Sequence, residues 1–145
     1  MDLNKELTQE VIDKLYELAL IGYNNSYSPY SNFKVGASLF TSSGKYFYGC
    51  NVENSSYGLS NCAERTTIFK AASEGVKPGE IKVLMVIGST NDPISPCGAC
   101  RQVMAEFMGF EGTIILTNLK KDLKIMKVKE LLPYGFSEAN LHEWI

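Results

Sequence analysis

The chain has 145 residues, of which 45% are hydrophobic, and it carries a formal net charge of -2 at pH 7. This length is enough for one compact core and short for two ordinary domains, so we expect a single domain over residues 1–145. The acidic balance provides no overall positive field to attract a phosphate backbone, which argues against a nucleic acid as substrate or partner.

The amino-terminal residues 1–6 lack the cationic start and apolar run of a secretory signal. No later apolar stretch reaches the roughly 20 residues that a transmembrane helix needs. We therefore expect a cytoplasmic protein without a membrane partner. In a reducing compartment, a Cys-x-x-Cys pair more often marks a metal or redox site than a structural disulfide.

The first part of the chain predicts a helix followed by a hairpin. Over residues 8–24, apolar side chains follow one stripe and charged side chains lie opposite, and Thr8 is a suitable N-cap. Pro29 disfavours helix in the next segment, which we expect to be a loop. Residues 35–40 and 46–52 are rich in β-branched and aromatic residues and flank a turn-type cluster, so they should pair as antiparallel strands.

The second part of the chain alternates between helix and strand. Helical signals resume over residues 61–74, and this helix offers five apolar residues for burial: Ala63, Ile68, Phe69, Ala71 and Ala72. Residues 81–88 read as a strand that is buried on both faces, and a second helix should follow Pro96. Further strands are expected at 113–117 and 125–128, with a helical turn at 130–132. This order predicts an α/β fold in which helices cover a mixed five-stranded sheet, a three-layer α/β/α sandwich.

Two short motifs carry the chemistry: residues 61–65 read NCAER, and residues 95–101 read SPCGACR. Both should lie at helix N-termini, so that Cys97 and Cys100, at i and i+3, face one metal ion together with Cys62. Thiolates suit zinc, and three protein ligands leave a fourth position open for water, which a hydrolytic zinc needs. Cys50 and His142 lack ligand-type spacing.

Glu64 lies two residues from Cys62 on the same helical turn, and we assign it as general acid and base because it can reach that water without being a ligand. Three thiolates around Zn²⁺ sum to a negative charge, which the helix N-termini and Arg65 would offset. The alternative for Arg65 is a surface ion pair. The alternatives for the three cysteines are ordinary buried thiols or part of a structural zinc site.

Five blocks of the sequence resemble the small cytidine deaminases in family order: SPYSNFKVGA at 28–37, NVEN at 51–54, CAER at 62–65, PCGACRQ at 96–102 and ELLP at 130–133. Zinc held by cysteines beside a non-ligand glutamate is a signature of such enzymes. The resemblance implies one Zn²⁺ per chain on Cys62, Cys97 and Cys100. It also implies hydrolytic deamination of cytidine and 2'-deoxycytidine to uridine and 2'-deoxyuridine, in which Glu64 protonates N3 while activated water attacks C4 and ammonia leaves.

The resemblance also implies the substrate contacts. Asn51 and Glu53 would hold the ribose 3'-hydroxyl, Phe33 would pack against the base, the Ala63 N–H would meet the cytosine carbonyl, and the Ser95 carbonyl would receive the departing amine. For Asn51 and Glu53, the alternative is a solvated pair at a strand end.

A cysteine at position 62, where some relatives have histidine, is similar to the three-cysteine subclass. This implies a homotetramer with shared active sites, in which Tyr57 and Phe136 come from neighbouring subunits and Phe136 stacks on the base. Three other functions stay open from the sequence: a blasticidin-type deaminase, a deaminase of nucleotides or nucleic acids, and a catalytically silent zinc module.

Overall fold

The computed structural model describes residues 7–142, so the expectation about residues 1–6 lies outside the described residues. Its centre is a five-stranded sheet in the order β2-β1-β3-β4-β5. The strands are β1 (Val35–Thr41), β2 (Tyr46–Cys50), β3 (Ile81–Gly88), β4 (Thr113–Asn118) and β5 (Leu123–Lys127). Only β3 and β4 pair in parallel, while the other neighbours are antiparallel. The predicted mixed five-stranded sheet is confirmed.

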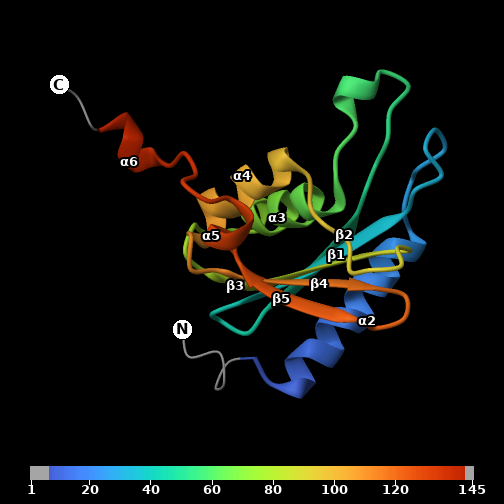
Figure 1. The fold of residues 1–145 in the computed structure, drawn as a ribbon, viewed down its shortest axis with the longest axis horizontal. Helices are drawn as coiled ribbons and strands as arrows, with labels where there is room; N and C mark the ends of the chain where they lie inside the picture. Colours follow the sequence, from blue (N-terminus) through green and yellow to red (C-terminus); the bar gives the residue numbers. More distant parts are fainter. Residues whose placement is uncertain (1–6, 143–145) are drawn as a thin grey trace.

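Helices cover both faces of this sheet (Figure 1). The long helices are α2 (Gln9–Asn24), which lies on one face, and α3 (Ala63–Ser73) and α4 (Gly98–Met108), which lie on the other. The short ones are η1 (Tyr57–Leu59), α5 (Val128–Leu131) and α6 (Glu138–Leu141). The predicted three-layer sandwich is therefore confirmed. Within residues 7–142, none of the helices is long and apolar enough to pass through a bilayer.

The central strand β3 explains why the core has two halves. Side chains alternate between the faces of a strand, so Val83, Met85 and Ile87 join the apolar cluster under α2. Leu84 and Val86 join the larger cluster under α3 and α4. All five are fully buried, which confirms that β3 is apolar because both of its faces are covered.

Several predicted boundaries shift in the structure. Helix α2 begins where expected, since the Thr8 hydroxyl accepts the Val11 N–H at 3.2 Å. The fifth strand occupies 123–127 rather than 125–128, because Val128 already starts α5. Phe69 was expected to be available for burial, but it is 46% exposed, because it lies on the outward face of α3. The helix α6 was not predicted.

Three chain segments meet at one end of the sheet and prepare the site. The last residue of β3, Gly88, pairs with the first residue of β1, Val35. In the hairpin, Gly36 pairs with Cys50, where β2 ends. The loop before β1, the segment after β2 and the loop after β3 therefore gather at the same end of the sheet. The segment after β2 continues through η1 into α3, and the loop after β3 leads into α4.

The backbone of α2 lies directly against the β1–β2 hairpin at two glycines. A Cβ on Gly22 would lie 2.1 Å from the Gly49 carbonyl oxygen, and a Cβ on Gly36 would lie 2.0 Å from the Ala19 carbonyl oxygen. Both neighbours are backbone atoms, so neither contact can be relieved by rotating a side chain. Close packing of this layer therefore depends on the absence of a side chain at these positions.

We expect Gly22→Ala to lower the free energy of unfolding by about 1–3 kcal/mol, since overpacking forces the helix away from the hairpin. Urea denaturation of the purified variant measures this change. Gly58→Ala is the matched control, because a Cβ there meets nothing within 4 Å. Equal unfolding midpoints for the two variants would contradict the close approach of α2 to the hairpin.

Candidate active site

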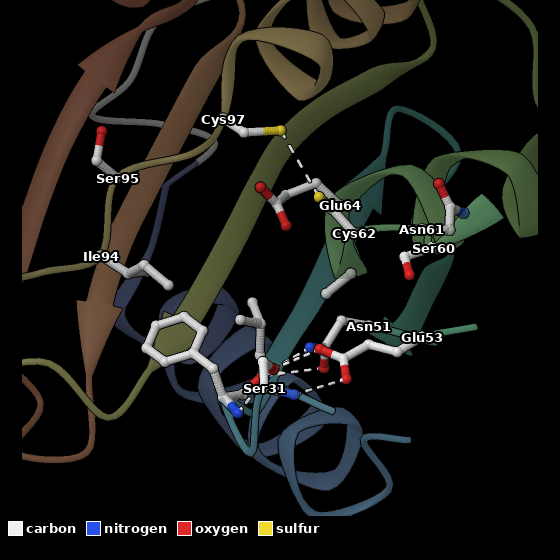
Figure 2. A pocket seen from close by; sticks show the side chains of 13 residues that line it. Ser31, Asn51, Glu53, Ser60, Asn61, Cys62, Glu64, Ile94, Ser95 and Cys97 are labelled. Carbon is white, nitrogen blue, oxygen red and sulfur yellow. Dashed lines mark hydrogen bonds between the residues drawn. The ribbon is translucent and has the colours of Figure 1, made fainter. Parts of the chain in front are cut away.

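A cavity of about 290 Å³ opens at this end of the sheet. Eight of the predicted site residues line it: Phe33, Asn51, Glu53, Cys62, Ala63, Glu64, Ser95 and Cys97. In Figure 2, Cys62, Cys97 and Glu64 lie at one end of the cavity, which we call the sulfur end. Ser31, Asn51 and Glu53 lie at the other, which we call the loop end. The fold thus joins residues that lie far apart in the sequence.

The sulfur end holds a cluster of three thiols. The Sγ atoms of Cys62, Cys97 and Cys100 all lie within 4.8 Å of one another, and those of Cys62 and Cys97 are 3.6 Å apart. A tetrahedral zinc ion with Zn–S bonds of about 2.3 Å places two sulfurs about 3.8 Å apart. The three thiols therefore fit three corners of a zinc tetrahedron, and Cys50 lies outside this group.

Two helix N-termini position these thiols. Cys62 is the N-cap of α3 and Cys97 is the N-cap of α4, while Cys100 lies buried in the first turn of α4. The unpaired N–H groups at a helix start carry partial positive charge, which favours thiolates there. The structure confirms that both motifs open helices.

Arg65 and Cys100 stabilise the ionised form of Cys62 at the sulfur end. The Arg65 Nη2 donates to the Cys62 Sγ at 3.4 Å. A hydrogen bond from the Cys100 thiol, helped by Arg65, lowers the pKa of Cys62 to about 5. The same hydrogen bond raises the pKa of Cys100, which keeps its proton. These contacts favour the thiolate form of Cys62, and zinc deprotonates the thiols that coordinate it when it binds.

Glu64, the second residue of α3, is buried beside the thiols and is only 3% exposed. In Figure 2 its carboxyl group points into the cavity. Burial, with the nearby Cys62 charge, raises the pKa of Glu64 to about 7. A carboxyl group whose pKa lies near the working pH can both accept and donate a proton. The position and environment of Glu64 therefore suit proton transfer.

At the loop end, Asn51 and Glu53 are fixed by the segment that precedes β1. The Asn51 Nδ2 donates to the Phe33 carbonyl at 2.8 Å. The Ser31 hydroxyl and two backbone N–H groups hold the pKa of Glu53 below its usual range. Glu53 is therefore an ionised acceptor. Both polar groups face the cavity, where they can bind a hydroxyl group of a substrate.

Comparison with known proteins identifies the family. Residues 9–117 match the family model for the cytidine and deoxycytidylate deaminase zinc-binding region. The sequence is 47% identical to the cytidine deaminase of Sporosarcina psychrophila over 130 residues. This alignment covers 90% of this chain and 94% of the relative. The chain belongs to the cytidine deaminase family.

Solved structures of cytidine deaminases have the same fold. The cytidine deaminase from Burkholderia pseudomallei superposes with a TM-score of 0.84 at 51% identity, covering 86% of this chain and 98% of that one. The one from Mycobacterium tuberculosis gives a TM-score of 0.74 at 33% identity, covering 87% and 97%. These matches confirm the predicted family, fold and zinc-dependent deaminase class. They do not favour a blasticidin-type deaminase or a silent zinc module.

Two predicted substrate contacts of the deaminase lie away from its cavity. Tyr57 is 75% exposed and meets Tyr30 edge-on, with ring centroids 6.0 Å apart. Phe136 is 56% exposed and lies between α5 and α6. Neither residue lines the cavity within the described chain. Their predicted roles concern neighbouring subunits, so they stay predictions.

Two further residues of the deaminase support the site, although the sequence predicts no role for them. Arg101 donates to the Pro96 carbonyl at 2.9 Å and to the Ser95 hydroxyl at 2.7 Å, so it fixes the loop that carries Cys97. Ser31 lines the cavity and hydrogen-bonds to Glu53. Both residues lie inside sequence blocks that resemble the family. Their positions in these blocks could have indicated a role from the sequence.

In this deaminase, Arg65→Ala should weaken zinc retention or activity by about 10–100-fold, as is typical for partners of metal ligands. The reason is the loss of the guanidinium group that contacts Cys62. Zinc release to a chromophoric chelator, measured beside steady-state turnover, tests this expectation. Lys77→Ala removes the same charge from an exposed position outside the cavity and should change neither quantity. Wild-type behaviour of Arg65→Ala would remove Arg65 from the site.

Proposed function

We propose that this chain catalyses the hydrolytic deamination of cytidine and 2'-deoxycytidine, which yields uridine and 2'-deoxyuridine and releases ammonia. The observation that carries the proposal is one cavity with two different ends: three clustered thiols beside a buried carboxyl, and a hydroxyl-binding pair opposite. The relatives named cytidine deaminases support a cytosine nucleoside as the substrate.

Cys62, Cys97 and Cys100 would hold one zinc ion per chain. When bound, zinc supplies a Lewis acid that makes water nucleophilic at neutral pH. With only three protein ligands, the site would leave one coordination position for water, as a hydrolytic zinc site requires. The Arg65 guanidinium group and the two helix N-termini offset the thiolate charge.

Glu64 would carry the protons. It takes one proton from the attacking water and gives it to N3 of the cytosine ring while the C4–O bond forms. It then moves the second water proton to the amino group at C4, the C–N bond breaks, and ammonia leaves as C4 becomes a carbonyl. The sum is one water consumed and one ammonia released, and Glu64 returns to its starting state.

The backbone at the sulfur end would orient the base. Ala63 is the first residue of α3, so its N–H has no partner within the helix and can donate to the cytosine carbonyl. The Ser95 carbonyl would accept the departing amine, and Phe33 would pack against the ring. All three residues line the cavity, which supports their proposed roles.

Asn51 and Glu53 would bind the ribose 3'-hydroxyl. The Glu53 carboxylate would accept a hydrogen bond from this hydroxyl. Asn51 would donate to the hydroxyl oxygen through the amide hydrogen that does not bond to the Phe33 carbonyl. The separation of this pair from Glu64, at opposite ends of the cavity (Figure 2), leaves room for a nucleoside between them.

We also propose that residues 1–145 form one domain and that the chain acts in the cytoplasm as a homotetramer with shared active sites. The exposed aromatic rings of Tyr57 and Phe136 support this assembly, because neighbouring subunits would cover them. The carboxyl-terminal segment with α6 projects from the body of the subunit (Figure 1), where it can reach another copy.

A substrate panel tests the proposed function. The zinc-loaded chain is given cytidine, 2'-deoxycytidine, cytidine 5'-monophosphate and blasticidin S, and pyrimidine products and ammonia are measured. We expect equal amounts of uridine and ammonia from cytidine, and a higher kcat/KM for the nucleosides than for the nucleotide. Turnover of blasticidin S without turnover of either nucleoside would overturn the proposal.

A further inference from the structure

One turn of the loop before β1 holds the Glu53 carboxylate in place. Its Oε1 accepts the backbone N–H groups of Tyr30, at 3.0 Å, and Ser31, at 3.1 Å. Its Oε2 accepts the Ser31 hydroxyl (Figure 2). Two of these three donors belong to Ser31, which lies 22 residues from Glu53 in the sequence. Ser31 therefore sets the orientation of this carboxylate.

The same serine hydroxyl also holds Phe33. The Ser31 Oγ accepts the Phe33 N–H at 3.0 Å, across Asn32, whose φ of 57° is left-handed. Asparagine tolerates this conformation better than most residues. A hydroxyl has one proton to donate and two lone pairs to accept with. Because the proton goes to Glu53 and a lone pair to Phe33, a single oxygen atom joins the proposed ribose contact to the proposed base contact.

These bonds determine what Glu53 can still bind. Each carboxylate oxygen has about two lone-pair sites, and an ionised carboxylate only accepts. Among the donors of residues 7–142, Oε1 already has two, while Oε2 has the Ser31 hydroxyl alone. The free acceptor site is therefore on Oε2, on the oxygen whose position the Ser31 hydroxyl fixes. A substrate group that binds there must bring a proton of its own.

Asn51 supplies the complementary group. Its Oδ1 accepts the Val35 N–H at 3.0 Å and the Ser26 hydroxyl, so its acceptor capacity is used. Its Nδ2 donates one hydrogen to the Phe33 carbonyl, and its second hydrogen has no acceptor in the part of the chain that the structure describes. The loop end therefore offers one acceptor and one donor. An unmodified hydroxyl satisfies both, whereas a missing or blocked hydroxyl does not.

We propose that Ser31 is a positioning residue that makes the loop end selective for a free 3'-hydroxyl, by fixing Oε2 of Glu53 and the backbone of Phe33 with one hydroxyl group. The proposal rests on the ribose role of Asn51 and Glu53 given above. Ser31 lies at the loop end, away from Glu64 (Figure 2), so its loss leaves proton transfer intact. The effect of its removal falls on substrate binding.

The test compares two enzymes with two substrates. Ser31→Ala should lower kcat/KM for cytidine about tenfold, mainly through KM, as expected when a hydrogen bond to a charged group is lost. For 3'-deoxycytidine, which lacks the hydroxyl, Ser31→Ala should lower kcat/KM clearly less than for cytidine, because only the lost contact with the Phe33 backbone affects this substrate. Ser31→Thr keeps the hydroxyl on an exposed residue and should restore most of the loss with cytidine.

Ser43→Ala is the matched control, because it removes a serine hydroxyl that bonds to Thr41 Oγ1 at the other end of β1. It should behave as wild type with both substrates. If thermal denaturation shows that Ser31→Ala is unfolded, Ser31→Cys replaces it, since a thiol keeps the size and is only a weak donor.

The outcomes separate this inference from the proposed function. An equal loss on cytidine and 3'-deoxycytidine, or no loss on cytidine, would overturn the role of Ser31. Glu53→Gln provides the independent check on the ribose pair and should reduce the preference for cytidine over 3'-deoxycytidine. If Glu53→Gln keeps the full preference, the proposed ribose contact fails instead. Loss of preference in Glu53→Gln but not in Ser31→Ala leaves the proposed function standing and rejects Ser31.

Discussion

Glu64→Gln should lower kcat for cytidine by about 10²- to 10⁴-fold, the usual contribution of a positioned acid and base. The amide has nearly the same shape as the carboxyl group, so the buried position in α3 is preserved, but glutamine cannot relay protons between water, N3 and the amine. Zinc content and folding should stay at wild-type levels. Steady-state kinetics and metal analysis of the same preparation measure all three.

Glu74→Gln is the control for this variant, because it makes the same chemical change at the exposed C-cap of the same helix. Its kcat should equal that of the wild type. If zinc-loaded Glu64→Gln turned over cytidine at the wild-type rate, Glu64 would not be the proton carrier. Its raised pKa would then be only a consequence of burial.

Cys97→Ala should reduce zinc affinity by more than about 100-fold, since even outer-shell partners of a metal are worth 10–100-fold. Only two thiols of the cluster remain, and they can no longer define three corners of a tetrahedron. Turnover should fall with the bound zinc. The melting temperature should also drop, because a metal that binds only the folded state stabilises it. Metal analysis after dialysis against a chelator, together with calorimetry, tests these expectations.

Cys50→Ser is the matched control for the loss of a cysteine. Cys50 ends β2 and its thiol lies 3.6 Å from the Asn25 carbonyl, outside the three-thiol cluster. This variant should keep one zinc ion per chain. Loss of zinc from Cys50→Ser would mean that the ligand set differs from Cys62, Cys97 and Cys100.

The sulfur end was predictable because metal chemistry constrains both residue type and spacing. A Cys-x-x-Cys pair on a first helical turn places two sulfurs on one side of the helix. The short Cys-x-Glu spacing keeps Cys62 and Glu64 together at the start of α3. The structure brings these residues together at two helix N-termini, with Glu64 buried in the first turn of α3. Such local geometry can be inferred without knowing the rest of the fold.

Other features depend on contacts that the sequence pattern does not show. Strand β5 is largely exposed, including its apolar residues Leu123 and Ile125, so its register has a weak hydrophobic signal. Ser31 acquires its contact with Glu53 only when the loop before β1 folds against the segment after β2. The proposed roles of Tyr57 and Phe136 depend on contacts with further copies of the chain, which the order of elements in one chain does not reveal.

Zinc removal and reconstitution test zinc-dependent cytidine deamination most directly. The chain is stripped with a chelator, assayed for uridine and ammonia from cytidine, reloaded with increasing zinc and assayed again. We predict no turnover by the stripped chain, and turnover that rises with bound zinc up to one ion per chain, with uridine and ammonia in equal amounts. Full zinc occupancy without conversion of cytidine or 2'-deoxycytidine would contradict the proposed function, as would full activity of the metal-free chain.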